Sequence, residues 1–141
     1  MATSVAILLV EDNPDDAALT EVALRQLPAQ VEVARDAREA LDYLFGDSHH
    51  APQLVLLDLR LPDSDGLEVL RRIREDERTR LVPVVVLTSS MLPGDVAASY
   101  RLGANSFVRK PSDFDRFSER VREIGAYWLG VNEPPSNAGD Q

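Results

Sequence analysis

The sequence predicts an α/β fold with a five-stranded parallel sheet and helices on both of its faces. Short continuous apolar runs, typical of strands buried on both faces, alternate with amphipathic stretches of helical spacing. The alternation occurs five times within 141 residues, a length that suits one compact domain. Five consecutive strand–helix units favour a doubly wound sheet, and we expect the strand order 2-1-3-4-5.

Five strands are expected from local composition. The first is the uninterrupted apolar run VAILLV, and the third ends in the run LVLL directly before an aspartate. The second is a brief alternating segment, and the fourth carries a proline near its start. The expected strands cover residues 5–10, 30–34, 53–57, 82–87 and 105–109.

Five helices are expected, each marked by an apolar periodicity and by residues that start or stop helices. Pro28 stops the first helix, and Gly103 closes the fourth. Asp36 is a good N-cap for the second helix, and Gly46 lies just past its end. Ser112 opens the last helix. The expected helices cover 15–27, the segment between Asp36 and Gly46, 66–76, 93–102, and the chain from 112 onward.

Composition excludes several classes of protein. The formal net charge of −9 argues against non-specific binding to nucleic acid or to an anionic membrane. The chain contains no cysteine, which rules out disulfides and thiolate metal sites and fits a reducing compartment. Neither a signal peptide nor an apolar stretch of about 20 residues is found. We expect a cytoplasmic domain over residues 1–131, followed by a disordered polar tail over 132–141.

Polar side chains end four of the five predicted strands. Glu11 and Asp12 follow the first strand, Asp58 the third, Thr88 the fourth and Lys110 the fifth. In the order 2-1-3-4-5 these four strands are neighbours, so their carboxyl ends form one rim. Clustered carboxylates repel one another unless a cation or a proton relieves them, and oxygen-only ligands suit Mg²⁺. With a lysine beside the metal to bind an anion, the rim suits phosphoryl transfer to a nucleophilic aspartate.

Each of these residues has a more ordinary interpretation when it is taken alone. An aspartate at a strand end often only caps a helix or solubilises a loop, and this holds for Asp58. Thr88 alone would be a strand-end hydroxyl, and Lys110 alone a solvated charge. The functional interpretation depends on all of them lying at strand ends that are adjacent in the predicted sheet.

The same segments resemble the signature of response-regulator receiver domains, which have the flavodoxin-like fold. The resemblance is carried by the pair Glu11-Asp12, by LVLLDLRLP at 54–62 with Gly66, by VVVLTS at 84–89 and by Lys110-Pro111. It extends from residue 5 to about residue 131. It implies a signalling protein that is not an enzyme for other substrates and that catalyses only its own phosphorylation and dephosphorylation.

The resemblance also implies a Mg²⁺ site and assigns its ligands by position. Asp58 resembles the phospho-acceptor of the family, and Asp12 resembles the carboxylate that binds Mg²⁺ directly. Glu11 resembles the carboxylate that reaches the metal through water, and the backbone carbonyl of Arg60 resembles the third protein ligand, with Asp58 itself in the metal shell.

Further positions resemble the phosphoryl partners and the switch of the family. Thr88 and Lys110 resemble the partners of the phosphoryl oxygens, and the Lys110–Pro111 peptide bond resembles one that is cis in receivers. Phe107 stands where a tyrosine is frequent, and we expect it to rotate inward when Thr88 moves toward the phosphoryl group.

Two positions are expected to tune dephosphorylation. Arg60 and Ser90 lie two residues beyond Asp58 and Thr88. We expect both side chains at the mouth of the site, where they would screen or admit the attacking water. Arg60 would also attract an anionic phosphodonor.

Three local strings resemble the phytochrome-associated single-domain regulators within this family. They are EDNPD at 11–15, KPSDF at 110–114 and YWL at 127–129. The resemblance implies a sensor histidine kinase, of the bacteriophytochrome type, as the phosphodonor. No sequence for a DNA-binding domain follows Val131, so we expect output through protein contacts.

Two other functions remain as alternatives at this stage. A metal-dependent phosphohydrolase could use Asp58 on a similar sheet, but such enzymes commonly need a second acid where this chain has Arg60. A phosphorylation-independent adaptor would keep only the fold, and the intact set of Asp12, Asp58, Thr88 and Lys110 argues against it.

The end of the last helix carries more apolar residues than one helix face needs. Phe114, Phe117, Val121 and Ile124 are expected to form the stripe that faces the sheet. Tyr127, Trp128, Leu129 and Val131 then follow. An exposed patch of this kind favours a homodimer through the fourth helix, fifth strand and fifth helix. Alternatively, residues 127–129 fold back on the first helix as ordinary core.

Overall fold

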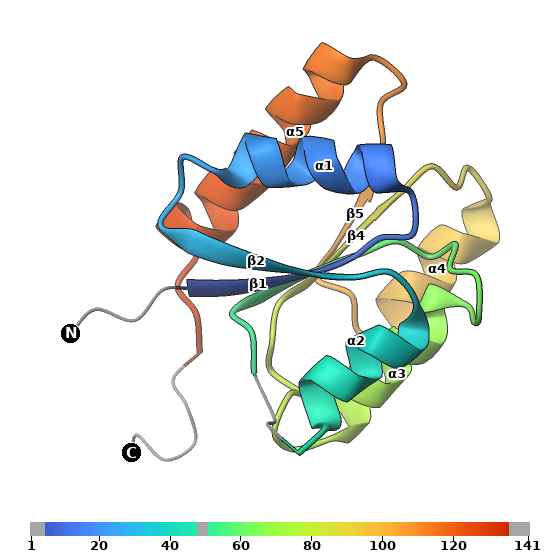
Figure 1. Cartoon of the computed structure of the whole chain (residues 1–141). Helices are drawn as coiled ribbons and strands as arrows, with labels where there is room; N and C mark the ends of the chain where they lie inside the picture. Colours follow the sequence, from blue (N-terminus) through green and yellow to red (C-terminus); the bar gives the residue numbers. More distant parts are fainter. Residues whose placement is uncertain (1–4, 48–50, 136–141) are drawn as a thin grey trace.

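The computed structural model describes residues 5–47 and 51–135, which form a parallel sheet in the order β2-β1-β3-β4-β5 (Figure 1). The predicted topology is therefore confirmed. The strands are β1 (Val5–Val10), β2 (Ala29–Ala34), β3 (Leu54–Leu57), β4 (Val84–Thr88) and β5 (Ser106–Arg109). The helices are α1 (Pro14–Leu24), α2 (Ala37–Phe45), α3 (Gly66–Glu75), α4 (Pro93–Arg101) and α5 (Phe114–Ala126), and a π-helical turn, η1, covers Tyr127–Val131.

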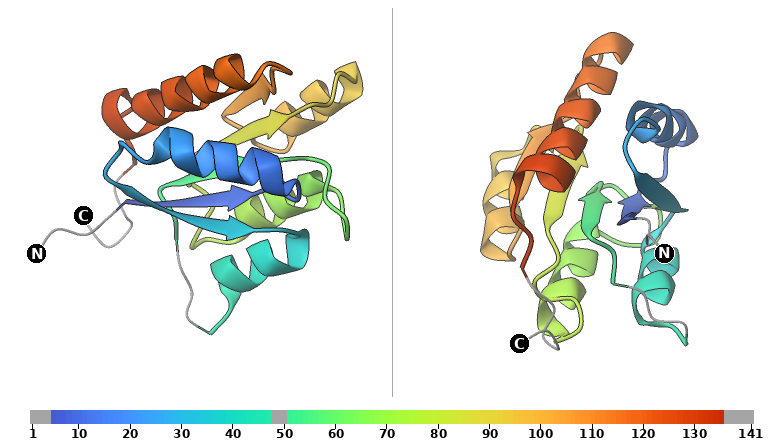
Figure 2. Two further views of the ribbon diagram at one scale, coloured as in Figure 1. Left: turned by 45° about the horizontal axis from the view of Figure 1, so that its top comes forward. Right: turned by 90° about the vertical axis from the view of Figure 1, so that its left-hand side faces the viewer.

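The sheet separates two apolar layers. Helices α1 and α5 cover one face, whereas α2, α3 and α4 cover the other (Figures 1 and 2). Successive strand residues point to opposite faces, so Leu8 and Val10 pack with α2 and α3 while Ile7 and Leu9 pack with α1 and α5. All residues of β3 and β4 are buried, because both strands lie inside the sheet with helices on either side. Among the described residues, no helix is long and apolar enough to cross a bilayer.

Two helix boundaries differ from the prediction by more than one residue, and side-chain caps mark where several of the helices start. The Asn13 side chain accepts hydrogen bonds from the first backbone N–H groups of α1, and Asp113 caps α5 in the same way. Helix α5 therefore begins at Phe114, two residues later than the predicted Ser112. Helix α1 ends at Leu24, three residues earlier than predicted, because a residue before proline, here Leu27, is disfavoured in the helical conformation.

Gly66 brings α3 against the end of β3. A Cβ atom at this position would lie 2.4 Å from the backbone oxygen of Asp58 and 2.8 Å from Cα of Leu59. Only a residue without a side chain allows this approach. The motif glycine thus fixes the segment that carries the aspartate.

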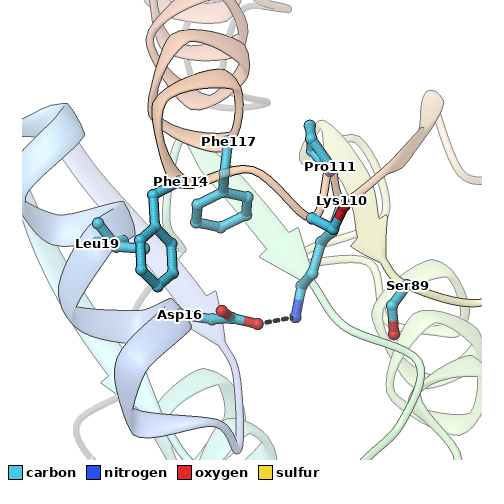
Figure 3. Close-up of a pocket in the computed structure, with 8 residues that line it drawn as sticks. Asp16, Leu19, Ser89, Lys110, Pro111, Phe114 and Phe117 are labelled. Atoms are coloured by element: carbon cyan, nitrogen blue, oxygen red, sulfur yellow. Dashed lines mark hydrogen bonds and ion pairs between the residues drawn. The ribbon is translucent and has the colours of Figure 1, made fainter.

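The apolar end of α5 is arranged differently from the prediction. Phe117, Val121 and Ile124 face the sheet as expected, but Phe114 is 68% exposed, so its expected place in the inward stripe is wrong. As the first residue of the helix, Phe114 lies over Leu19 of α1 and outside the core (Figure 3). The apolar residues that follow α5 differ in burial. Trp128 and Leu129 pack partly against the core, whereas Tyr127 and Val131 are exposed.

Candidate functional site

The carboxyl ends of β1, β3, β4 and β5 meet at one edge of the sheet. The backbone N–H of Asp58 donates to the oxygen of Val10 at 3.0 Å, and that of Lys110 donates to the oxygen of Thr88 at 2.8 Å. These ladder bonds place the first residues after the strands side by side. The structure therefore brings together four side chains predicted from the sequence: Glu11, Asp58, Thr88 and Lys110.

Asp58 is a buried carboxylate whose two oxygens have different partners. The Thr88 hydroxyl and the backbone N–H of Arg60 donate to Oδ1, at 2.8 Å and 3.1 Å. The ammonium of Lys110 donates to Oδ2 at 2.8 Å. These donors hold the carboxylate in a single orientation.

Lys110 is the only lysine of the chain, and its ammonium lies among three carboxylates. Besides Asp58, it donates to Oε1 of Glu11 at 2.7 Å and to Oδ2 of Asp16 at 2.9 Å. The Lys110 side chain is almost fully buried. Three carboxylates around one ammonium leave an excess of negative charge in a poorly solvated place.

Burial and the hydrogen bonds to charged partners shift the pKa values of both Glu11 and Lys110. Burial raises the pKa of Glu11 to about 7, although the hydrogen bond from Lys110 favours its ionised form. Burial alone would lower the pKa of Lys110, but its hydrogen bonds to Asp58, Glu11 and Asp16 outweigh burial and raise it. Lys110 is therefore a permanent cation at neutral pH, and the carboxylates lack a second positive charge.

The donor set fits a divalent cation. The carboxylates are hard oxygen ligands of the kind Mg²⁺ prefers, and one ammonium does not neutralise them. Asp12, the residue after Glu11, is exposed, and Arg60 lies two residues after Asp58. Among the described residues no three acidic or histidine side chains already surround a common metal position, and the Lys110 ammonium lies between three carboxylates instead.

Two sequence-based expectations about neighbouring groups are wrong. Ser90 is buried rather than at the mouth of the site, because its hydroxyl turns to the carboxylate of Asp95 on α4 and accepts from the Leu92 N–H at 3.3 Å. The Lys110–Pro111 peptide bond is trans, since all peptide bonds among the described residues are trans. Trans is also the lower-energy form of an X–Pro bond.

Phe107 lies on β5 as predicted, opposite Val86 of β4. Its side chain is partly buried and packs against the core layer that contains α2 and α3. This placement agrees with a core aromatic. Its expected rotation stays a prediction.

Asp16 is the site residue that the sequence analysis missed. It lies in the first turn of α1, four residues after Asp12. It was not singled out from the sequence, because acidic residues are common in the first turn of a helix. Its position was available from the sequence, because the helix that follows β1 must start at the same edge of the sheet as the strand ends. A residue one turn into that helix can reach the rim.

A cavity of about 230 Å³ opens beside Lys110, between α1 and the start of α5 (Figure 3). Asp16, Ser89, Lys110 and Phe117 are among its lining residues. Next to it, Val22, Leu19 and Phe114 line a shallower apolar groove on the surface of α1. The cavity beside Lys110 is therefore bordered on the α1 side by an apolar groove.

Comparison with known proteins gives the family of this fold and site. The model of the response regulator receiver domain matches residues 7–122. The chain belongs to the response-regulator receiver family. The prediction made from the separated sequence motifs is thereby confirmed.

Several known receivers are similar over almost the whole chain. The probable methanogenesis regulatory protein FilR2 of Methanothrix harundinacea is 45% identical over 137 residues, which cover 94% of this chain and 88% of that protein. The phosphorylated cyanobacterial phytochrome response regulator RcpA is 36% identical with a TM-score of 0.90, covering 95% of this chain and 100% of that one. The Mn²⁺-bound form of the response regulator Rcp1 is 34% identical with a TM-score of 0.88, covering 94% and 99%.

Receiver domains bind Mg²⁺ or Mn²⁺ at their acidic phosphorylation site and interact with histidine kinases. In this receiver Glu11, Asp16 and Asp58 lie around Lys110 at the carboxyl edge of the sheet. Receiver domains are generally non-enzymatic signalling proteins.

Proposed function

We propose that this receiver accepts a phosphoryl group on Asp58 from a histidine kinase, in a Mg²⁺-dependent reaction, and signals through protein contacts. The observation that carries the proposal is the set of donors around Asp58. One carboxylate oxygen is held by Thr88 and by the Arg60 N–H, and the other is held by Lys110. A nucleophile held by groups that can next bind the transferred phosphoryl oxygens is prepared for the reaction.

The transfer step exchanges one bond to phosphorus for another. A carboxylate oxygen of Asp58 attacks the phosphorus of a phosphohistidine, the P–N bond breaks as the P–O bond forms, and the imidazole nitrogen keeps the bonding electrons. Lys110 then turns one N–H toward a phosphoryl oxygen. The Thr88 hydroxyl, released from the carboxylate, donates to another.

The residues suited to hold Mg²⁺ are Glu11, Asp12, Asp58 and the backbone carbonyl of Arg60. The bound ion supplies positive charge against the phosphoryl oxygens as they approach the carboxylates. Without the ion, the carboxylates of the site outnumber its single ammonium, so the site repels an anionic donor. We therefore expect the reaction to require the metal.

The phosphodonor we propose is a sensor histidine kinase of the phytochrome type, acting in the cytoplasm. The likeness to RcpA and Rcp1 supports this assignment, because RcpA is described as a phytochrome response regulator. In the response, movement of Thr88 leaves room beneath β4 for the ring of Phe107. The resulting change would reach the face formed by α4, β5 and α5.

We also propose that this face forms a homodimer. Tyr100 of α4 and Met91 and Leu92 before it are exposed apolar side chains, and Val131, in the turn after α5, is also exposed. Light scattering should report a dimer for wild type and a monomer for Tyr100→Glu. Val22→Glu, which adds the same charge to an exposed position on α1, should remain dimeric. A wild type that is monomeric at high concentration would contradict the dimer.

The experiment that tests phosphorylation uses acetyl phosphate as the donor and intact mass as the measurement. Wild type with Mg²⁺ should gain the mass of one phosphoryl group. Asp58→Asn, or wild type with a chelator, should gain none. Asp65→Asn is the control, because this residue caps α3 near the site and should be labelled like wild type. Labelling of Asp58→Asn at the wild-type rate would overturn the assignment.

A further inference from the structure

The environment of Lys110 contains one carboxylate that neither the acceptor nor the expected metal shell uses. An ammonium group has three N–H donors and no acceptor. All three are matched here, by Glu11 at 2.7 Å, Asp58 at 2.8 Å and Asp16 at 2.9 Å. A phosphoryl oxygen that binds Lys110 must therefore displace or share one of these partners.

We propose that Asp16 is a positioning residue that competes with the incoming phosphoryl group for the Lys110 ammonium and so weakens anion binding at this site. The proposal rests on the function proposed above. Asp16 would restrain Lys110, and it would thereby set how strongly the site binds anions relative to divalent cations.

Asp16 is the partner that Lys110 can release most easily. The Glu11 side chain is only 3% exposed and also accepts from the backbone N–H of Asn13 at 3.0 Å. The Asp16 side chain is 27% exposed, and Lys110 is the only partner of its carboxylate among the described residues. A partly exposed carboxylate recovers hydration when its partner leaves, whereas a buried one does not.

The location of Asp16 also affects an approaching anion. Asp16 and Lys110 line the same cavity, with the carboxylate on α1 directed across it at the ammonium (Figure 3). An anion that enters this cavity meets the negative charge of Asp16 and an ammonium already saturated with acceptors. Both effects oppose anion binding, and both become weaker when the carboxylate is replaced by a neutral amide.

The proposal predicts changes of opposite sign for two ligands. In Asp16→Asn one Lys110 N–H is freed from a charged acceptor, so an anion should bind more tightly. The Lys110 charge is also less neutralised, so a divalent cation should bind more weakly. A variant that only loosened the site would bind both ligands more weakly, and this difference separates positioning from structural damage.

Calorimetric titration would measure both ligands. Beryllium trifluoride anion, with Mg²⁺ at saturation, is the phosphoryl probe, and Mg²⁺ alone is the cation probe. One unit charge removed near the site should strengthen binding of the anion by about threefold to tenfold and weaken binding of Mg²⁺ by about twofold. The control is Asp15→Asn, which makes the same charge change at the preceding, exposed residue and should leave both affinities near those of wild type.

A second measurement needs neither metal nor anion. Because Lys110 is the only lysine, protein labelled with ¹⁵N-lysine has a single side-chain ammonium signal. In Asp16→Asn this signal should shift and its protons should exchange faster with water, whereas Asp15→Asn should leave it unchanged. An unchanged signal in Asp16→Asn, or equal anion affinities in the two variants, would overturn the role of Asp16 and leave the phosphorylation proposal standing. A wild type that binds no anion with Mg²⁺ would overturn both proposals.

Discussion

The Thr88 hydroxyl donates a 2.8 Å hydrogen bond to Oδ1 of Asp58, and both side chains are buried. This bond joins the end of β4 to the end of β3 at the proposed phospho-acceptor. Thr88 holds the carboxylate in this structure, and in the proposed reaction it would also hold the phosphoryl group after transfer.

Replacing Thr88 with valine should affect both tasks. Thr88→Val keeps the shape of the side chain but removes the donor, so the unfolding free energy should fall by about 1–2 kcal/mol. Phosphorylation by acetyl phosphate should slow by about tenfold, the equivalent of one lost hydrogen bond. Thr88→Ser keeps the hydroxyl and should retain most of the rate. Denaturant unfolding and intact-mass time courses measure the two effects, and equal rates in the two variants would contradict the assigned role.

Arg60 should act on the rate of phosphorylation through its charge. Its backbone N–H holds Asp58 while its exposed side chain adds a positive charge near the site. In Arg60→Ala, acetyl phosphate should label the protein about twofold to fivefold more slowly at low ionic strength, because an anionic donor is attracted less strongly. The difference should shrink in about 0.5 M salt, where the Debye length falls to a few Å.

The matched variant for this test is Arg60→Lys, which retains the charge. It should follow wild type at every salt concentration. If the labelling rate of Arg60→Ala falls by the same factor at low and at high salt, Arg60 does not act through its charge. A loss of rate that salt does not change would arise from altered geometry. The lifetime of the phosphorylated form, measured in the same samples, tests the expected effect on dephosphorylation.

The elements that set the fold were predictable because each has a local cause. The continuous apolar runs of β1, β3 and β4 predict strands that are buried on both faces of a sheet. Asp36 caps α2 as its residue type predicts. Asp58, Thr88 and Lys110 were predictable because strand order alone brings their backbones together.

The errors concern side-chain directions, which depend on several neighbours at once. Phe114 was assigned to the core from helical spacing, but as the first residue of α5 it lies beside Leu19 of α1 and stays exposed. Ser90 was assigned to the mouth of the site, and the alternative partner that buries it, Asp95, lies five residues away on the next helix. Asp16 was overlooked because a carboxylate in a first helical turn already has an ordinary explanation.

Gly103 and Arg74 form a contact that should be intolerant of substitution. Gly103 has φ of +105°, and a Cβ atom there would lie 2.9 Å from Nε of Arg74. The partly buried Arg74 guanidinium donates to the backbone oxygens of Gly103 at 2.9 Å and Val82 at 2.7 Å, and to the Asn105 side chain at 2.8 Å. These bonds tie α3 to the segments before β4 and β5.

Gly103→Ala should therefore lower the unfolding free energy by about 1–3 kcal/mol, from the left-handed backbone and the displaced guanidinium. Gly94→Ala is the control, because a Cβ atom there meets nothing within 4 Å. It should change stability little, and both variants should still be phosphorylated, since this contact does not touch the site. Equal stabilities of the two variants in denaturant unfolding would argue against the contact.

Asp63 should make the stability of the protein depend on pH in a defined direction. Its two carboxylate oxygens accept from the backbone N–H groups of Ala37 at 2.9 Å and Arg38 at 3.0 Å, so a residue of the β3–α3 loop caps α2. The hydrogen bond from the Ala37 N–H, with that from Arg38, lowers the pKa of Asp63 from its ordinary value of 3.8. The folded state therefore holds the ionised form more strongly than the unfolded chain does.

An acid whose pKa is lower in the folded state stabilises that state above its unfolded pKa and loses the effect as the pH falls through its folded pKa. Wild type should thus have a higher Tm than Asp63→Asn at pH 7, and the difference should narrow as the pH falls below about 4. Ser64→Ala is a control at the next residue of the same loop, whose hydroxyl makes only a long local bond at 3.4 Å. Its difference from wild type should be small and independent of pH. Thermal unfolding between pH 3 and pH 7 measures both series, and a gap between wild type and Asp63→Asn that stays constant over this range would show that the ionised cap does not contribute.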